Sequence, residues 1–185
     1  FISSEDQAIA LDFFAGSSTT AHAVMQLNAE DGGKRRFIMV QLPELTPENS
    51  EARKAGFETI AEISRKRIEL AGEKIGTGDT GFRVFKLDTS NIRAWNPNPV
   101  DLEASLVDHQ DHLLEGRSEA DVLYELLLKL GLDLCVPIEQ RTIAGREVHA
   151  VGGGVLMACL AEQMSCEKVE ALAQGIVDWH KELAP

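Results

Sequence analysis

The stretch from Ala8 to Val24 holds the residues whose types and spacing are best suited to chemistry. An apolar run that ends at Phe14 is followed by Gly16, two serines and two threonines. A glycine lets a ligand approach the backbone closely, and the first N–H groups of a helix have no intrahelical partners and can bind a polar or anionic group. This pattern predicts the binding turn of a nucleotide-type cofactor at the carboxyl end of a strand.

Three elements must position this turn. The apolar run before it predicts a strand that is buried on both faces, and the residues after it predict a helix that stops near the loop at 28–33. The continuous apolar run within Arg36–Glu44 predicts a second buried strand. A strand, a helix and a strand form a right-handed βαβ unit, so we expect parallel strands with the helix over one face.

Residues 12–24 resemble the cofactor loop of the amino-group DNA methyltransferases that use S-adenosylmethionine, in the branch where this loop lies late in the chain. More narrowly, they are similar to the modification subunit of type III restriction-modification systems, and this resemblance continues through residues 81–95. It implies S-adenosylmethionine as the cofactor. It also implies cofactor-binding roles for these residues of the loop: Asp12, Phe13, Phe14, Ala15, Gly16, Ser17, Thr19 and Thr20.

One position of the loop departs from this family. Most of its members have a glycine where this chain has Ser18. A Cβ atom there narrows the space around the cofactor, or requires a changed turn if φ is positive. If the side chain obstructs the cofactor, a Ser18→Gly variant is expected to bind it more tightly.

A polar or acidic group at the end of the second strand is expected to accept hydrogen bonds from the ribose hydroxyls of the cofactor. Gln41 and Glu44 are the two candidates. Gln41 is closer in register to the second strand of the family, whereas the carboxylate of Glu44 has the better chemistry. Glu44 can equally be a turn residue before Leu45, so the assignment stays open between the two.

The family flips the target base out of the helix and holds its amino group with an Asp-Pro-Pro-Tyr segment. This sequence contains no such segment: none of its six prolines are adjacent, and its single tyrosine, Tyr124, lies in a predicted helix. In the branch that the loop resembles, the catalytic motif and the target-recognition region precede the loop, and this sequence begins at Phe1, just before it. We therefore assign no catalytic residues and expect the isolated chain to be inactive.

The resemblance thus implies the C-terminal portion of a modification subunit, which binds S-adenosylmethionine within a DNA adenine N6-methyltransferase. DNA would be bound through N-terminal parts of the full subunit. The alternative is an assembly module whose acidic C-terminal helices pair two modification subunits or dock the restriction subunit. A second modification subunit and a restriction subunit are the expected protein partners.

The expected fold class is α/β, with a partial Rossmann-like methyltransferase sheet followed by a small α+β C-terminal domain. Residues 1–95 form the predicted cofactor-binding half. Residues 96–100, which contain Asn96-Pro97-Asn98-Pro99, form a predicted linker because this run can continue neither a helix nor a central strand. Residues 101–185 form the predicted acidic domain.

Hydrophobic periodicity predicts the remaining elements. In the first half these are a helix over 57–71, ended by Gly72 and the glycines at 76 and 78, and a half-exposed strand over Gly81–Asp88. In the second half we expect a short helix near Leu102, a helix between Ser118 and Gly131, a hairpin around Ala144-Gly145 and a final helix over 165–183. Gly152-Gly153-Gly154 is interpreted as a bend before an apolar run, because it lacks the lysine of a phosphate loop.

The net charge of −12 is distributed unevenly. Residues 1–100 contain 14 acidic and 12 basic side chains, and residues 101–185 contain 16 acidic and 6 basic ones. Phosphate binding needs clustered lysine and arginine, so the second half is not expected to bind DNA. The basic groups at 34–36 and 65–67 are interpreted as solvated surfaces.

The sequence shows neither an apolar run of membrane-spanning length nor a leader, so we expect a cytoplasmic protein without membrane contact. Cys135, Cys159 and Cys166 lack Cys-x-x-Cys spacing and are expected to be reduced core thiols. No metal site is expected from them.

Overall fold

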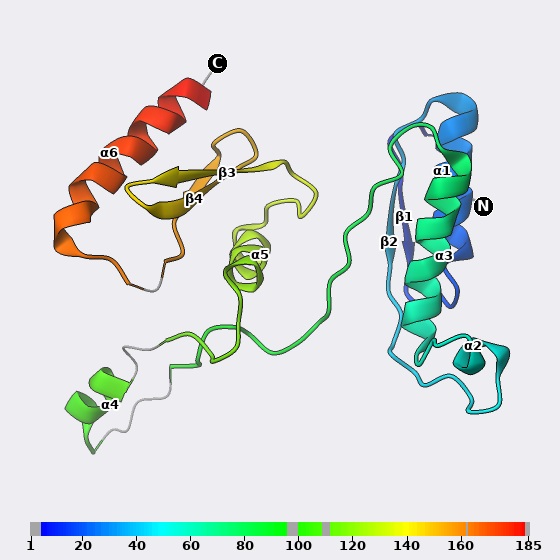
Figure 1. Cartoon of the computed structure of the whole chain (residues 1–185), viewed down its shortest axis with the longest axis horizontal. Coiled ribbons are helices and arrows are strands. Elements are labelled where there is room, and N and C mark those ends of the chain that lie inside the picture. Colours follow the sequence, from blue (N-terminus) through cyan, green and yellow to red (C-terminus); the bar gives the residue numbers. More distant parts are fainter. Residues whose placement is uncertain (1–4, 96–99, 109–111, 162, 184–185) are drawn as a thin grey trace. The chain divides into compact units, whose positions relative to one another are not determined.

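The computed structural model describes residues 5–95, 100–108, 112–161 and 163–183. The chain divides into two compact units, Phe1–Phe85 and Lys86–Pro185 (Figure 1). Each unit has its own sheet and its own buried clusters.

The first unit contains the predicted βαβ arrangement. Strand β1 (Ile9–Asp12) leads through a short turn into helix α1 (Thr19–Asp31), which is followed by strand β2 (Arg36–Met39). The two strands are parallel, with Ile9 opposite Arg36 and Asp12 opposite Met39. Gly32, at a φ of 73°, ends α1 where the sequence predicts a stop. The prediction of a parallel βαβ unit is confirmed.

Helix α3 (Ile60–Ile75) packs beside α1 over one face of this strand pair (Figure 1). It follows the short helix α2 (Glu51–Lys54) and begins with a capping box, in which Thr59 and Glu62 each bond the backbone of the other. It ends at Gly76, one of the glycines predicted to end it, whereas Gly72 is buried inside the helix and does not end it. The cluster between helices and sheet is formed by Ala21, Met25, Ile68 and Ala71, with Phe37, Met39, Ile75 and Phe82 packed against it.

The opposite face of the strand pair is apolar and exposed. Its apolar side chains are Ile9, Leu11, Ile38 and Val40, which are 40–53% exposed, and the exposed Arg36, opposite Ile9, lies on the same face. Parallel strands are normally covered on both faces. Because this face is exposed, the prediction that both strands are buried on both faces is wrong for this chain.

The predicted strand over Gly81–Asp88 is also wrong, because these residues form no ladder. Alternating polarity produces a strand only where a neighbouring strand offers free backbone groups. Among the described residues, β1 and β2 pair with each other alone, and no third strand joins them. Phe82 packs against the helix–sheet cluster of the first unit, while Leu87 is 99% exposed.

The second unit is built on an antiparallel sheet of the order β3-β4-β5. Strands β3 (Ile138–Ile143) and β4 (Arg146–Val151) form the predicted hairpin, and β5 (Leu156–Ala158) follows the three glycines. Ala144 and Gly145 have φ values of 49° and 77°, as a tight two-residue hairpin turn requires. The hairpin prediction is confirmed.

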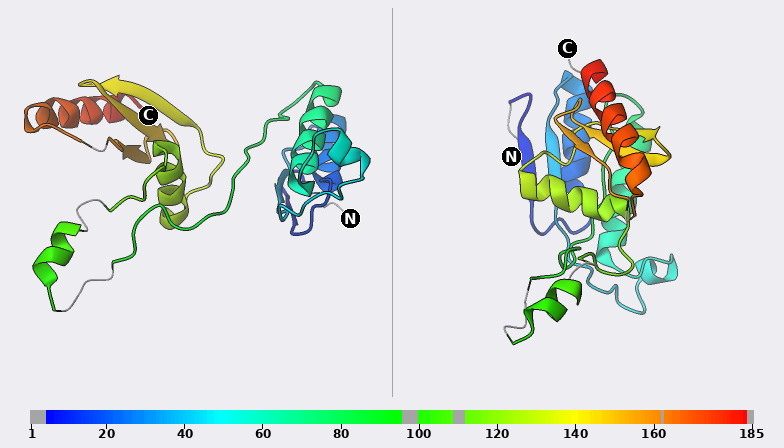
Figure 2. Two further views of the ribbon diagram at one scale, coloured as in Figure 1. Left: turned by 60° about the horizontal axis from the view of Figure 1, so that its bottom comes forward. Right: turned by 90° about the vertical axis from the view of Figure 1, so that its left-hand side faces the viewer.

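Helices cover this sheet on both faces (Figure 2). Helix α5 (Glu119–Leu130) packs Leu123 and Leu127 against Val151 and Ala158. Helix α6 (Cys166–Leu183) packs Leu172 and Trp179 against Val148 and Ala150 on the other side. Gly175 permits close approach of α6 to β3, since a Cβ there would overlap Cγ2 of Ile143.

Helix α5 has the ends that the sequence predicts. Ser118 caps its start in a capping box with Asp121, and Gly131, at a φ of 70°, caps its end. The short helix α4 (Leu102–Asp108) lies where a helix near Leu102 is expected.

Residues 88–93 belong to the second unit. Asn91 donates from Nδ2 to the carbonyl oxygen of Asp121 over 3.0 Å, and Ile92 forms an antiparallel bridge with Leu113. The boundary between the two compact units therefore follows Phe85, ten residues before residue 95, where the first domain is predicted to end. Residues 96–99 of the predicted linker lie outside the described residues, so the linker stays a prediction.

The structure shows a mixed α/β chain with helices and two small sheets. Two parallel strands are too few to identify a Rossmann-like sheet, so that part of the fold remains a prediction. None of the described helices combines the length and the apolar character that crossing a membrane requires.

Candidate functional site

The candidate site is the turn between β1 and α1, at the carboxyl end of β1. Its backbone is anchored to the neighbouring strand, because the N–H of Ala15 donates to the carbonyl oxygen of Val40 over 3.2 Å. Gly16 follows with a φ of 53°, which favours glycine. A Cβ built on Gly16 meets only the carbonyl oxygen of Phe14, at 4.0 Å, so the space beside this residue is open.

Asp12 links the end of the strand to the first turn of the helix. Its Oδ1 accepts the N–H of Phe14 over 3.2 Å, and its Oδ2 accepts the hydroxyl of Thr20 over 2.8 Å. Both oxygens therefore have a partner inside the turn. The half-buried carboxylate therefore holds the shape of the turn.

The structure separates the two candidates at the end of the second strand. Gln41 reaches the turn, since the N–H of Gly16 donates to its Oε1 over 2.7 Å. Glu44 has an exposed side chain, and its carbonyl oxygen accepts the N–H of Ile60 at the start of α3 over 2.9 Å. Gln41 is therefore part of the structure around the turn, and a ribose contact by either residue stays a prediction.

Ser18 is the N-cap of α1 and has left-handed backbone angles, φ 56° and ψ 44°. Its side chain makes no capping hydrogen bond to the helix. Instead, its hydroxyl pairs with that of Ser64 on α3, and Ser18 is fully buried. The helix thus begins without a side-chain acceptor for its first N–H groups, which leaves them for another acceptor.

Two residues of α3 belong to this site although the sequence analysis did not select them. Ser64 holds Ser18, and Arg67 donates from Nη1 to the hydroxyl of Ser17 over 3.0 Å. Helical spacing alone does not show whether such a residue packs in the core, faces solvent or contacts the turn. Only the packing of α3 beside α1 distinguishes these roles.

The remaining predicted site residues line the outer surface of the turn. Phe13 is 62% exposed and Phe14 is 86% exposed, so two aromatic rings face solvent beside the open space at Gly16. Thr19 is exposed and Thr20 is half-buried. The arrangement offers helix N–H groups, a carboxylate, an amide and aromatic rings to a ligand that has both polar and planar parts.

No protein-family model matches the chain. Curated relatives do match it. The chain is 34% identical over 184 residues to the Mod subunit of the type III restriction-modification enzyme EcoP15I of Escherichia coli, a match that covers 98% of this chain and 27% of the relative. It is 46% identical over 91 residues to the StyLTI Mod subunit of Salmonella typhimurium, with 46% of this chain and 14% of the relative covered.

A third relative carries a different name. The type II methyltransferase M.KpnI of Klebsiella pneumoniae is 41% identical over 66 residues, which cover 36% of this chain and 16% of that protein. The chain therefore spans about a quarter of the length of the relative that it matches from end to end. These findings confirm the resemblance to a C-terminal portion of a type III modification subunit.

Proposed function

We propose a function for this chain from the premise that it corresponds to a C-terminal part of the Mod subunits of type III restriction-modification enzymes. In this proposal the chain is the S-adenosylmethionine-binding part of a DNA adenine N6-methyltransferase. Homology to Mod subunits and to a methyltransferase supports a role related to DNA methylation. The observation that carries the finer proposal is the turn around Gly16, with open space at its backbone and an uncapped helix start beside it.

The residues present fit S-adenosylmethionine. The first N–H groups of α1 can bind its carboxylate, and Asp12 can attract its positive charge. The exposed rings of Phe13 and Phe14 can stack on its adenine. Bound S-adenosylmethionine would supply an activated methyl group for transfer to an amine.

The residues of this chain would bind and orient, since the chain contains no Asp-Pro-Pro-Tyr segment that could hold a flipped base. Asp12 and Gln41 keep the turn in one conformation through their bonds to Thr20 and Gly16. Their common effect is to fix the backbone at Gly16 before the cofactor arrives, which reduces the entropy lost on binding.

The partners are proposed at the level of the whole subunit. We propose that DNA, a second Mod subunit and a restriction subunit are bound through a longer polypeptide, of which the relatives have about four times this length. The exposed apolar face of β1 and β2 supports such a continuation, because parallel strands are usually covered on both faces. No specific observation favours the assembly module as a separate function, so we do not propose it.

The test is isothermal titration calorimetry of the full 185-residue chain with S-adenosylmethionine. We expect saturable one-to-one binding with a dissociation constant below about 1 mM. An Asp12→Asn variant should bind more weakly, because the substitution removes the negative charge and one of the two carboxylate oxygens available to accept the hydroxyl of Thr20. Absence of heat and of a thermal shift at millimolar ligand would contradict the proposal.

A pair of glycine variants controls for backbone strain. Gly16→Ala and Gly78→Ala both introduce a Cβ at positive φ, 53° and 77°, at similar steric cost. Only the Cβ at position 16 enters the space beside the turn. Gly16→Ala should lose about tenfold or more in affinity, while Gly78→Ala should bind like the natural chain.

A further inference from the structure

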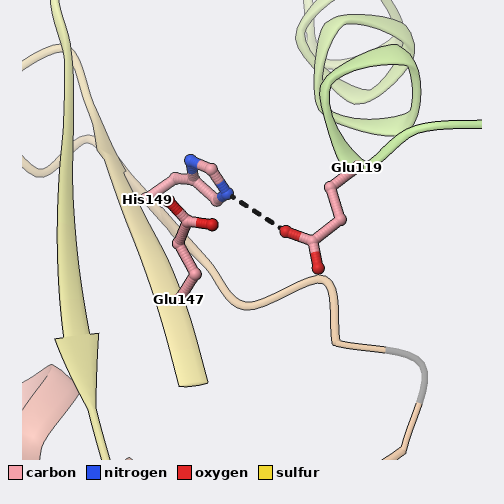
Figure 3. Close-up of side chains that lie close together, drawn as sticks. All are labelled: Glu119, Glu147 and His149. Carbon is pink, nitrogen blue, oxygen red and sulfur yellow. Dashed lines mark ion pairs between the residues drawn. The ribbon is translucent and has the colours of Figure 1, made fainter. Parts of the chain in front are cut away.

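Three side chains with metal-ligating atoms converge between α5 and β4 in the second unit (Figure 3). They are Glu119, the first residue of α5, and Glu147 and His149 of β4. Glu147 and His149 are two positions apart on one strand, so both point to the face that α5 covers, whereas Val148 and Ala150 point to α6. One imidazole nitrogen and an oxygen of each carboxylate all lie within 4.8 Å of one another.

The imidazole of His149 is the unusual member of this cluster. Its side chain is only 4% exposed, and its Nε2 is buried without a hydrogen-bond partner. A buried polar atom that lacks a partner costs free energy, so native proteins rarely leave one unused. This nitrogen points to the carboxylate of Glu119, whose Oε2 lies 3.7 Å away (Figure 3).

The two carboxylates are free to respond to a cation. Both glutamates are exposed, so their side chains can rotate. Among the residues that the structure describes, neither has an ion pair with lysine or arginine. Two negative charges beside a buried imidazole nitrogen form an attractive site for a positive ion.

The other ring nitrogen of His149 is held by a neighbour. Gln140 lies opposite His149 on β3, and its amide nitrogen Nε2 lies 3.2 Å from Nδ1 of His149. In this orientation the amide N–H donates to Nδ1. Histidine ligands of metals usually donate their second N–H to such a group. Metal binding through Nε2 therefore requires the amide of Gln140 to be flipped, so that its oxygen accepts Nδ1–H and the lone pair of Nε2 is directed at the two carboxylates.

We propose that Glu119, Glu147 and His149 bind a divalent transition-metal ion of the zinc class. One imidazole and two carboxylates are a donor set that Zn²⁺ accepts, with a fourth position left to water. Zinc ligands in a tetrahedron lie about 3.3 Å apart at bond lengths of about 2.0 Å. The distance between His149 and Glu119 is already 3.7 Å, so small rotations of the exposed glutamates complete the site.

The ion would join the start of α5 to the sheet. Glu119 comes from the helix and the other two ligands come from β4, so one ion links elements that are far apart in sequence. Metal binding to the folded form alone raises its stability by mass action. The site is independent of the proposed cofactor turn, which lies in the first unit.

The decisive experiment is titration of the full chain with Zn²⁺ alone, followed by calorimetry. We expect one ion per chain for the natural sequence. Glu119→Gln and Glu147→Gln should each weaken binding by about tenfold or more, because both keep the side-chain size and remove the charge. Glu139→Gln on β3, an exposed residue at an adjacent register position whose side chain points to the other face, is the matched control and should leave binding unchanged.

His149→Gln should abolish stoichiometric binding, whereas His180→Gln, at an exposed position of α6, should not. Circular dichroism checks that each variant is folded, and the two glutamate variants decide the outcome if His149→Gln unfolds. Co²⁺ absorption should show nitrogen and oxygen ligation without thiolate bands. The proposal is overturned if no stoichiometric ion binds, if both glutamate variants bind normally, or if thiolate bands identify a cysteine site. In the first two cases the approach of Glu119 to His149 is a contact between side chains only.

Discussion

At the scale of single residues, Ser18 combines two features that rarely occur together. Its backbone is left-handed, a conformation that costs a non-glycine residue about 1–2 kcal/mol. Its hydroxyl is buried and bonded to Ser64 on a helix 46 positions further along the chain. The side chain points into the contact between α1 and α3, so the serine gains a buried hydrogen bond at the cost of backbone strain.

Two substitutions separate these contributions. Ser18→Ala keeps the strain and leaves the hydroxyl of Ser64 without its partner, so it should lower the free energy of unfolding of the first unit by about 1–3 kcal/mol. Ser18→Gly loses the same bond but relieves the strain, so it should be about 1 kcal/mol more stable than the alanine variant. Urea unfolding followed by NMR signals of α1 and α3 measures both.

The double variant Ser18→Ala/Ser64→Ala serves as a control and should cost little more than either single change, because the two hydroxyls form one interaction. A glycine variant that is as unstable as the alanine variant would contradict the assignment of strain. Because the hydroxyl is engaged with Ser64, we expect Ser18→Gly not to tighten cofactor binding through removal of an obstruction.

A second comparison at this scale decides between Gln41 and Glu44. Gln41→Ala removes the acceptor of the Gly16 N–H, whereas Glu44→Ala changes an exposed side chain and keeps its carbonyl bond to Ile60. We expect Gln41→Ala to weaken S-adenosylmethionine binding by about tenfold and Glu44→Ala by less than about threefold. Calorimetry on both variants provides the measurement, and the reverse order would assign the ribose contact to Glu44.

At the scale of elements, Glu125 of α5 binds residues 90 and 91, which precede the helices of the second unit. Its carboxylate forms an ion pair with Lys129 at 2.8 Å. It also accepts hydrogen bonds from the hydroxyl of Ser90 and, over 2.6 Å, from the N–H of Asn91. These donors, Lys129 first, lower the pKa of Glu125 from 4.5 to about 2. The charged form is thus favoured in the folded protein.

This shift predicts a loss of stability in acid. Because the folded pKa lies below the unfolded value, the contribution is present above about pH 4.5 and is lost as the pH falls toward about 2. Glu125→Gln should make the second unit less stable near neutral pH and reduce the difference between pH 5 and pH 2.5, both chosen to bracket the titration. Urea midpoints read from Trp179 fluorescence measure the change; equal pH dependence in both proteins would contradict it.

At the scale of the whole molecule, the chain consists of two units with separate cores. Residues 88–93 contact α5 and residues 112–114, so they complete the second unit rather than the first. The predicted division at 96–100 would separate these residues from their partners.

Two fragments test this division. A fragment of residues 86–185 retains the bonds of Ser90 and Asn91 to α5, whereas a fragment of residues 101–185 lacks them. We expect the longer fragment to melt several degrees higher, since a few lost hydrogen bonds shift the midpoint by about 4–8 °C per kcal/mol in a small domain. Thermal unfolding by circular dichroism compares the two, and equal midpoints would favour a boundary at the proline-rich segment.

Features that depend on neighbouring residues could be predicted from the amino-acid sequence. The turn with Gly16, the parallel βαβ unit, the helix ends at Ser118 and Gly131 and the hairpin at Ala144-Gly145 follow from local periodicity and backbone preference. The resemblance to type III modification subunits rests on the same local motif, and homology confirmed it.

Contacts between side chains that are distant in the sequence could not be predicted in this way. The pairing of Ser18 with Ser64, the contact of Gln41 with Gly16 and the approach of Glu119 to His149 depend on how helices pack on sheets. The failure of Gly81–Asp88 to form a strand has the same origin, because a strand needs a partner edge that its own residues do not encode. Side-chain type and spacing specify an element and its faces, while the packing of elements specifies what each face touches.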